Sequence, residues 1–304
     1  MTSNPSQAIF EHFSRVSSIL SKYDLDLNTR RTILDTVDVL AAEPPRVTYQ
    51  EVQCPGTCKP AIWCEPLDAP ASHVILYVHG GGGFTGSPSA YRKLAAHIAL
   101  ASGVRTLVLD YRLAPEHPFP AGLDDVVTAY QWLSRQKKIP SENIALVGDS
   151  AGAGIALCSI IRLKQLKADL PAAVAAVCPW VDMELTGETY DSNADKDAIG
   201  SRAGLEAMAA MLLNGASPKS PLVNALYADF SGYVSLYIVG AGDEVFLDDA
   251  RRLAVLAKEK DVDVYLEIAT GMQHDFVFMA GRAPEADATI QRLGDWMKLK
   301  LRLK

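Results

Sequence analysis

Short apolar runs alternate with helical segments over most of this chain, and this alternation restricts the fold more than any other feature. Runs typical of buried strands lie at 73–80, 104–111, 143–149, 172–180, 234–243 and 262–269, and a last helix is expected near 284–302. Apolar strands separated by helices are typical of a parallel sheet that is covered on both faces. Two further strands, at 46–53 and 61–66, have the pattern of an edge hairpin. We therefore predict an α/β fold with a mostly parallel central sheet.

The first 45 residues differ from this pattern because they predict two amphipathic helices. Phe13, Val16 and Leu20 recur at helical spacing in the first of them. We expect Asn28 to cap the second helix and the sequence "EPP" at 43–45 to end it.

A second interruption lies at residues 182–224, which have no strand pattern and contain a Met/Leu-rich helix. Open α/β folds bind ligands at the carboxyl edge of the sheet. We therefore predict that residues 1–45 and 182–224 form a helical cap over that edge, and that residues 46–181 and 225–304 form the core.

Composition excludes several classes of protein. The net charge is −7, and the one basic cluster is the short tail "KLKLRLK", so nothing favours binding to nucleic acid or to an anionic membrane. The apolar runs are too short to span a membrane, and the N-terminus lacks a leader pattern, so we expect a cytoplasmic protein. Five cysteines argue against a disulfide framework, and the spacing of Cys54, Cys58 and Cys64 does not match a metal site.

The pentapeptide "GDSAG" at 148–152 stands between a predicted strand and a predicted helix. At such a junction the G-x-S-x-G pattern forms a sharp turn that strains the serine backbone and exposes its hydroxyl above the sheet. The amide that follows, that of Ala151, lies at a helix N-terminus and points into the same site. Ser150 is therefore a candidate nucleophile.

A serine hydroxyl needs a general base and an acid that orients the base. In chains with this motif, the acid and then the histidine follow the serine. His274 in "GMQHDF" is the one histidine after Ser150, and it follows a predicted strand. Asp243 and Glu244 stand side by side after the strand run "SLYIV", and the residues alone leave the choice between them open.

Four glycines at 80–83 follow the buried run 74–78. Acyl transfer to serine builds negative charge on a carbonyl oxygen, which backbone amides stabilise well. We expect Gly81, Gly82 and Ala151 to donate these amides, with glycine in the loop because side chains there would block the substrate.

Five motifs in this order resemble the hormone-sensitive-lipase-like branch, bacterial family IV, of the α/β-hydrolase esterases. They are "HGGGGF" at 79–84, "DYRLAPEHPFPAGLDD" at 110–125, "GDSAG" at 148–152, "DEVFLDD" at 243–249 and "GMQHDF" at 271–276. The family spacing D-x-L-x-D is met when Glu244 is the first residue, so the resemblance implies the triad Ser150, Glu244 and His274. It also implies an α/β-hydrolase fold, no metal or cofactor, a structural role for His79 and a homodimer formed through a sheet edge.

The resemblance implies hydrolysis of a small-molecule ester through an acyl-enzyme. Phe84, Trp180 and Phe276 flank the motifs and are expected in the substrate pocket. Met208, Met211 and Leu212 either line an apolar acyl pocket or pack within the cap. Met suits a pocket that adapts to several shapes. No extended apolar surface indicates a lipid interface, so we expect short-chain or cyclic esters.

Other activities share these motifs. A lactone hydrolase, an amidase or a deacetylase would use the same triad, and the sequence does not separate them from an esterase. A receptor without catalytic activity is a different class. Gibberellin receptors resemble this branch but lack the catalytic histidine, which this chain keeps as His274.

Overall fold

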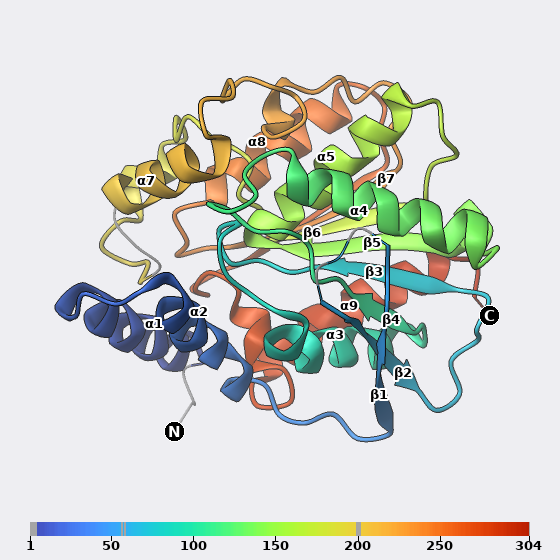
Figure 1. Ribbon diagram of the computed structural model, residues 1–304, viewed down its shortest axis with the longest axis horizontal. Coiled ribbons are helices and arrows are strands. Elements are labelled where there is room, and N and C mark those ends of the chain that lie inside the picture. The colour runs from blue at the N-terminus through green and yellow to red at the C-terminus, as the bar shows by residue number, and fades with distance from the viewer. Residues whose placement is uncertain (1–4, 56, 58, 199–201, 304) are drawn as a thin grey trace.

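The computed structural model describes residues 5–55, 57, 59–198 and 202–303 and shows a central sheet between two layers of helices (Figure 1). The strands are β1 Val47–Val52, β2 Ala61–Pro66, β3 Val74–Val78, β4 Thr106–Val108, β5 Ile144–Asp149, β6 Ala173–Val177, β7 Ser235–Ala241 and β8 Val264–Ala269. Within the described residues they form one eight-stranded sheet in the order β1-β2-β4-β3-β5-β6-β7-β8. The first two neighbouring pairs are antiparallel, and all the others are parallel. The predicted α/β class and the edge hairpin are confirmed.

Helices cover both faces of this sheet, as Figure 1 shows. The longer ones are α1 Pro5–Lys22, α2 Leu27–Leu34, α3 Pro88–Ser102, α4 Ala121–Gln131, α5 Ser150–Gln165, α7 Arg202–Leu213, α8 Leu247–Lys258 and α9 Pro284–Lys300. Short turns of helix are η1 Asp35–Val39, η2 Trp132–Gln136, η3 Ser141–Asn143, α6 Thr189–Ser192, η4 Ala225–Tyr227 and η5 Phe276–Met279. Helices α3 and α9 pack on one face, and α4, α5 and α8 pack on the other.

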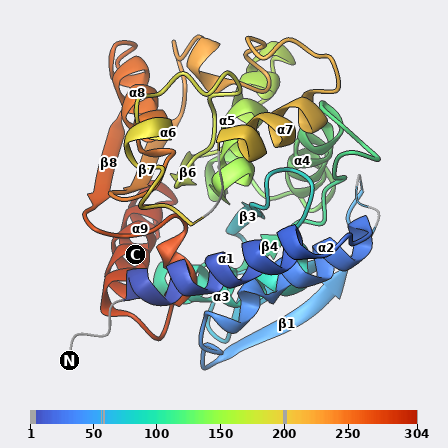
Figure 2. The same ribbon diagram turned by 90° about the vertical axis from the view of Figure 1, so that its left-hand side faces the viewer.

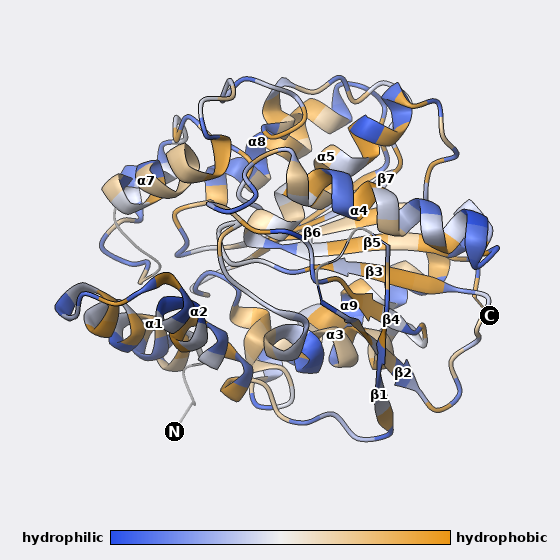
Figure 3. Cartoon of the chain, viewed as in Figure 1, coloured by the Kyte–Doolittle hydropathy of each residue, from blue (hydrophilic) through white to orange (hydrophobic). Residues whose placement is uncertain are grey.

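Strand β3 shows why the sheet needs both layers. Its alternate residues Val74, Leu76 and Val78 point into the hydrophobic layer shared with α4, α5 and α8. Ile75 and Tyr77 point into the opposite layer, shared with α3 and α9. Successive side chains of a strand point to opposite faces, so a strand of apolar residues is stable only when both faces are covered. Much of β3 and β5 is correspondingly coloured as hydrophobic in Figure 3.

The N-terminal helices and α7 lie at the edge where the parallel strands end (Figures 1 and 2). The expected start and end of the second helix are wrong. Helix α2 begins at Leu27, because the carboxylate of Asp26 accepts a hydrogen bond from the amide of Thr29 and caps the helix in place of Asn28. It ends at Leu34, where the chain tightens into η1 well before residues 43–45.

Parts of the sequence-based predictions fall outside the described residues. These are residues 1–4 and 199–201 of the predicted cap segments and Cys58. Cys54 and Cys64 are buried free thiols. No helix in the described ranges combines the length and the apolar character that crossing a membrane requires.

Candidate active site

Ser150 lies at the tight turn between β5 and α5, with a left-handed backbone (φ 50°). Glycines on either side of it allow the two elements to approach. A Cβ atom on Gly152 would lie 2.2 Å from the carbonyl oxygen of His79, and one on Gly148 would lie 2.5 Å from that of Gly152. The turn therefore requires glycine at both positions and holds the serine hydroxyl above the carboxyl end of the sheet.

The imidazole of His274 lies between Ser150 and Glu244. Its Nε2 atom is 3.0 Å from Ser150 Oγ, and its Nδ1 atom is 2.6 Å from Glu244 Oε2. The amide of Ala241 donates to the other carboxylate oxygen of Glu244 at 2.7 Å, which fixes the carboxylate. Asp243 is half-buried in the same loop, and its amide donates to the carbonyl oxygen of Met272. Of the two candidate acids, Glu244 is thus the one beside the imidazole.

A second carboxylate lies at the same imidazole. Asp275 Oδ2 is 3.1 Å from His274 Nε2, and both side chains are almost fully buried. Burial alone would lower the pKa of His274. The charge of Asp275 and the hydrogen bonds of Asp275, Cys178 and Glu244 outweigh this effect and raise the pKa well above its usual value. Burial raises the pKa of Glu244, and its hydrogen bond to His274 opposes that change.

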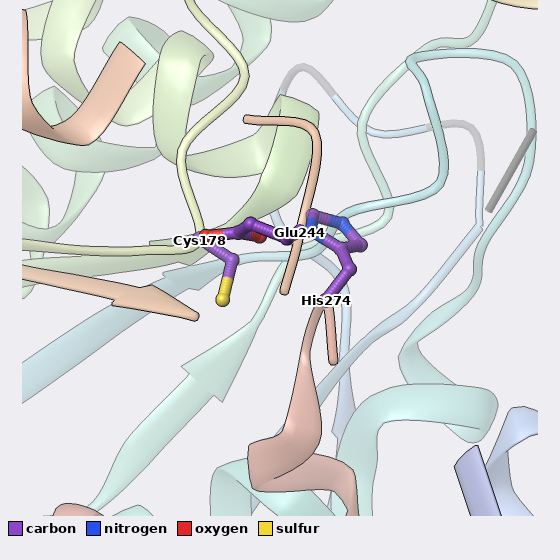
Figure 4. A group of neighbouring side chains, drawn as sticks. All are labelled: Cys178, Glu244 and His274. Carbon is purple, nitrogen blue, oxygen red and sulfur yellow. The ribbon is translucent and has the colours of Figure 1, made fainter. Parts of the chain in front are cut away.

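Cys178 is a third buried residue beside Glu244 and His274 (Figure 4). Its Sγ atom and one ligand atom each of Glu244 and His274 lie within 4.8 Å of one another. Three such residues are a candidate metal set, but burial raises the pKa of the thiol well above its usual value, whereas a metal needs the thiolate. The amide of Asp275 donates to the sulfur at 3.4 Å. The chemistry of this donor set favours a thiol that supports the His274 loop.

The glycine loop turns sharply beside the serine, with φ of 98° at Gly81 and 65° at Gly82. A Cβ atom on Gly81 would lie 2.4 Å from the carbonyl oxygen of Thr85, and one on Gly82 would lie 2.9 Å from the ring of Phe84 and 3.0 Å from Met208 Sδ. The expected reason for glycine, access for the substrate, is therefore incomplete, because the fold of the loop itself already requires it. Among the described residues none accepts a hydrogen bond from the amides of Gly81, Gly82 or Ala151.

His79 contacts the glycine loop through its ring nitrogen and packs beside it. Its Nδ1 atom is 2.9 Å from the carbonyl oxygen of Gly80, and its ring stacks on Tyr111 with 4.4 Å between centroids. Burial lowers the pKa of His79 to about 4, so the ring is neutral near pH 7 and its Nδ1–H donates to Gly80. Beside it, Asp149 Oδ1 accepts hydrogen bonds from the amide of Gly80 and the hydroxyl of Tyr77.

Arg31 of α2 holds the other end of the same loop. Its Nε atom donates to the carbonyl oxygen of Phe84 at 2.8 Å, and Nη2 donates to that of Ala114 at 3.0 Å. Both terminal nitrogens also bind the carboxylate of Glu116 at 2.7 Å. Arg31 has no signal in the sequence, because nothing in the pattern of an amphipathic helix identifies a contact 53 residues away.

A cavity of about 360 Å³ opens above Ser150 and His274. Residues from several elements line its apolar part: Phe13, Val16 and Leu20 of α1; Leu34 of α2 and Val37 of η1; Leu205 and Met208 of α7; and Phe84, Trp180, Phe246 and Phe278 of the core. Of the six expected pocket residues, Phe84, Trp180 and Met208 thus lie in this lining.

The other three lie elsewhere. Leu212 borders a separate cavity of about 30 Å³ together with Gly83. Met211 is half-buried on α7 and is absent from the described lining of both cavities. Phe276 is 1% exposed in the layer against α3 and α9, because the short helix η5 turns it inward and turns Phe278 toward the cavity. Phe13, Val16 and Leu20 were not among the expected pocket residues, although their helical spacing in the sequence indicated that they share one face of α1.

Comparisons with known proteins agree with this fold. A family model described as the alpha/beta hydrolase fold matches residues 75–278. An esterase from Acinetobacter venetianus is 31% identical over 91% of this chain and 90% of its own length. An acetyl-hydrolase from Streptomyces hygroscopicus is 32% identical over 84% of this chain and 89% of its own. The crystal structure of an esterase from the bacterial hormone-sensitive lipase family superposes with a TM-score of 0.93 at 34% identity and covers 99% of both chains. This chain therefore belongs to the alpha/beta hydrolase fold family and, within it, to the hormone-sensitive-lipase-like branch.

Proposed function

We propose that this protein is a serine carboxylesterase that hydrolyses small, short-chain or cyclic esters through an acyl-enzyme on Ser150. The observation that carries the proposal is the continuous set of close contacts from Ser150 Oγ through His274 to Glu244, beside three amides without a described acceptor. Membership of a branch of esterases supports the reaction class, and the site chemistry supports the mechanism.

In the first half-reaction, Ser150 attacks the ester carbonyl while His274 Nε2 takes the hydroxyl proton. Glu244 accepts the hydrogen bond from Nδ1 and stabilises the imidazolium that forms. The amides of Gly81, Gly82 and Ala151 donate to the oxygen that becomes negative. The imidazolium then returns the proton to the leaving alcohol, and the acyl group stays on Ser150.

In the second half-reaction, water attacks the acyl-enzyme, and the same groups act again. His274 takes a proton from the water, the three amides stabilise the second tetrahedral intermediate, and the proton returns to Ser150 Oγ. The carboxylic acid leaves, and the free enzyme is restored. Each step uses only groups of this chain, the ester and water.

The size of the cavity supports a small substrate. Ligand pockets commonly span about 300–1,000 Å³, and this cavity lies near the lower end of that range. One of the relatives is named an acetyl-hydrolase, which also favours a short acyl group. Because Phe13 and Leu20 come from α1 and Met208 comes from α7, we also propose that segments 1–45 and 182–224 act together as the cap of the active site.

Hydrolysis of p-nitrophenyl esters from acetate to palmitate, with one lactone and one anilide, tests the proposal. The wild type should prefer short acyl chains, and Ser150→Ala should lose activity by about a millionfold. Ser159→Ala is a matched control, because Ser159 is a buried serine of the same helix that donates to the carbonyl oxygen of Ile155.

Activity that survives Ser150→Ala would contradict the mechanism. A strong preference for the lactone or the anilide would instead keep the triad and change the substrate class. The resemblance to dimeric family members makes a homodimer part of the proposal, and the edge strands β1 and β8 are the sheet edges through which it would form. Sedimentation analysis that finds only a monomer would remove that part.

A further inference from the structure

We propose that Asp275 is a second carboxylate of the catalytic site, which accepts a hydrogen bond from protonated His274 Nε2 and competes with Ser150 for that nitrogen. The inference rests on the proposed function, since it concerns the same general base. Asp275 would act on Nε2 of His274, whereas Glu244 contacts Nδ1 on the other side of the ring.

The position of Asp275 is the first argument. Its Oδ2 atom lies 3.1 Å from Nε2, and Ser150 Oγ lies 3.0 Å from the same atom. A neutral imidazole whose Nδ1–H points at Glu244 has only a lone pair at Nε2. An ionised carboxylate beside a lone pair is repelled, whereas one beside Nε2–H is bound by a hydrogen bond assisted by charge. The geometry therefore matches the imidazolium form of His274.

The backbone around Asp275 is the second argument. The residue is left-handed, with φ of 53°, and its amide donates to Cys178 Sγ. Such a conformation is uncommon for a residue other than glycine, although Asp tolerates it better than most. It folds the carboxylate back over the imidazole of the preceding residue, and the side chain borders the cavity with the serine.

The surroundings of Asp275 give the third argument. The side chain is 6% exposed, and Oδ1 has no partner among the described residues. The groups that face the imidazole are Glu244 after β7, Cys178 after β6, Ser150 on α5 and Asp275 itself, and Asp149 of β5 interacts with both Asp275 and His274. Several acidic groups thus surround one imidazole. A buried carboxylate is expensive without a cation nearby, and His274 is the cation that this geometry offers to Asp275.

The consequence for the reaction has two parts. Asp275 stabilises the imidazolium that forms when Ser150 attacks, but it also keeps His274 protonated at pH values where a free imidazole would already be a base. Removing the negative charge makes His274 easier to deprotonate, so the acid limb of activity should move to lower pH. The neutral imidazole is then a weaker base, so the rate on the alkaline plateau should fall.

The test compares pH profiles of kcat/KM for the wild type and D275N with a p-nitrophenyl ester. We expect the midpoint of the acid limb to fall by about one pH unit or more and the plateau to fall as well, so that the two profiles cross. D275G is the second variant, because glycine adopts the left-handed backbone without strain and guards against a folding defect. D68N is a matched control, since Asp68 is 88% exposed and pairs with Arg46 far from the cavity.

If Asp275 had a purely structural role, its variants would lower kcat/KM at every pH without moving the midpoint of the acid limb. That result would overturn the inference. A second readout does not need activity. In protein labelled with ¹⁵N at histidine, the Nε2 of His274 should titrate at lower pH in D275N than in the wild type, and an unchanged titration would also overturn it. Ser150→Ala separates the two proposals. An active Ser150→Ala variant would refute the triad, whereas an inactive one combined with unshifted Asp275 variants would refute this inference alone.

Discussion

Three residues around the imidazole of His274 have left-handed backbones although none is glycine. They are Ser150, Cys178 and Asp275, with φ of 50°, 46° and 53°. Each such conformation costs about 1–3 kcal/mol and persists only where the surrounding structure determines it. Here the three chain segments come from the ends of β5, β6 and the loop after β8, so the sheet holds them in place. The left-handed backbones of these three residues therefore place the Ser150 hydroxyl, the Cys178 thiol and the Asp275 carboxylate around the imidazole of His274.

The choice between the two neighbouring acids can be tested at this scale. Glu244→Gln should lower kcat by about a thousandfold or more, because an amide can turn its NH₂ toward Nδ1 and disfavour the required tautomer. Asp243→Asn should change kcat little, since Asp243 is half-buried and Glu244 occupies the position at Nδ1. Steady-state kinetics of both variants provide the measurement. A larger loss for Asp243→Asn would reverse the assignment.

The residues that a sequence predicts best are those whose chemistry requires a fixed position in the chain. Ser150 and His274 follow from a strand-to-helix motif and from the order of nucleophile and base, and their placement follows from the carboxyl ends of parallel strands. Asp275 carried no such signal, because a carboxylate next to a histidine usually points elsewhere. What placed it at the imidazole is a backbone angle, and local sequence patterns predict such angles poorly.

At the scale of elements, Arg31 joins α2 to the glycine loop. Arg31 binds the carbonyl oxygens of Phe84 and Ala114 and the carboxylate of Glu116, so it joins the N-terminal segment, the glycine loop and the segment after β4. The glycine loop cannot hold itself rigid by side chains, because most of its residues have none. Its geometry depends on contacts supplied by neighbouring elements.

Arg31→Lys should therefore lower kcat by about ten- to a hundredfold with a smaller change in KM, because a shift of the loop weakens binding of the transition state more than that of the ester. Lysine cannot reproduce the planar set of donors that arginine presents. Arg46→Lys is the control, since the pair of Arg46 with Asp68 is exposed. Unfolding curves measured in parallel separate the two effects. A loss of stability with unchanged kcat would show that Arg31 only anchors α2.

The limits of α2 illustrate why elements at the edge of a fold are hard to delimit from sequence. Asp26 and Asn28 are both good cap residues, and only the turn of the chain before Leu27 decides between them. The central strands were easier, because burial on both faces leaves a continuous apolar run that no other element of that length produces.

At the scale of the whole molecule, the cavity wall is assembled from segments that lie far apart in the sequence. Helix α1 supplies Phe13 and Leu20, and α7 supplies Met208 on the opposite side, above a base that belongs to the sheet. The proposed catalytic groups belong to the sheet and its loops, whereas much of the apolar wall belongs to helices outside it. Substrate range and catalytic rate should therefore respond to different mutations.

Leu20→Trp should reduce the free volume and shift the preferred acyl chain toward acetate, whereas Phe13→Ala should extend it toward longer chains. The measurement is kcat/KM for the p-nitrophenyl series. Ile19→Trp is the control, because Ile19 is an exposed residue of the same helix. Unchanged chain-length profiles in both lining variants would show that the acyl group does not occupy this part of the cavity.

The distribution of the site along the chain also affects how the protein is made. Synthesis proceeds from the N-terminus, so α1 and α2 leave the ribosome long before Ser150 and longer still before His274. During that interval the apolar side chains of α1 have no cavity to line and no α7 to face. Ser150, the proposed nucleophile, has no general base until His274 has been synthesised. On the proposed mechanism, hydrolysis can therefore begin only after residue 274 has been translated and α1 has packed beside the later elements, and a chain released before residue 274 would be inactive however well its sheet had formed.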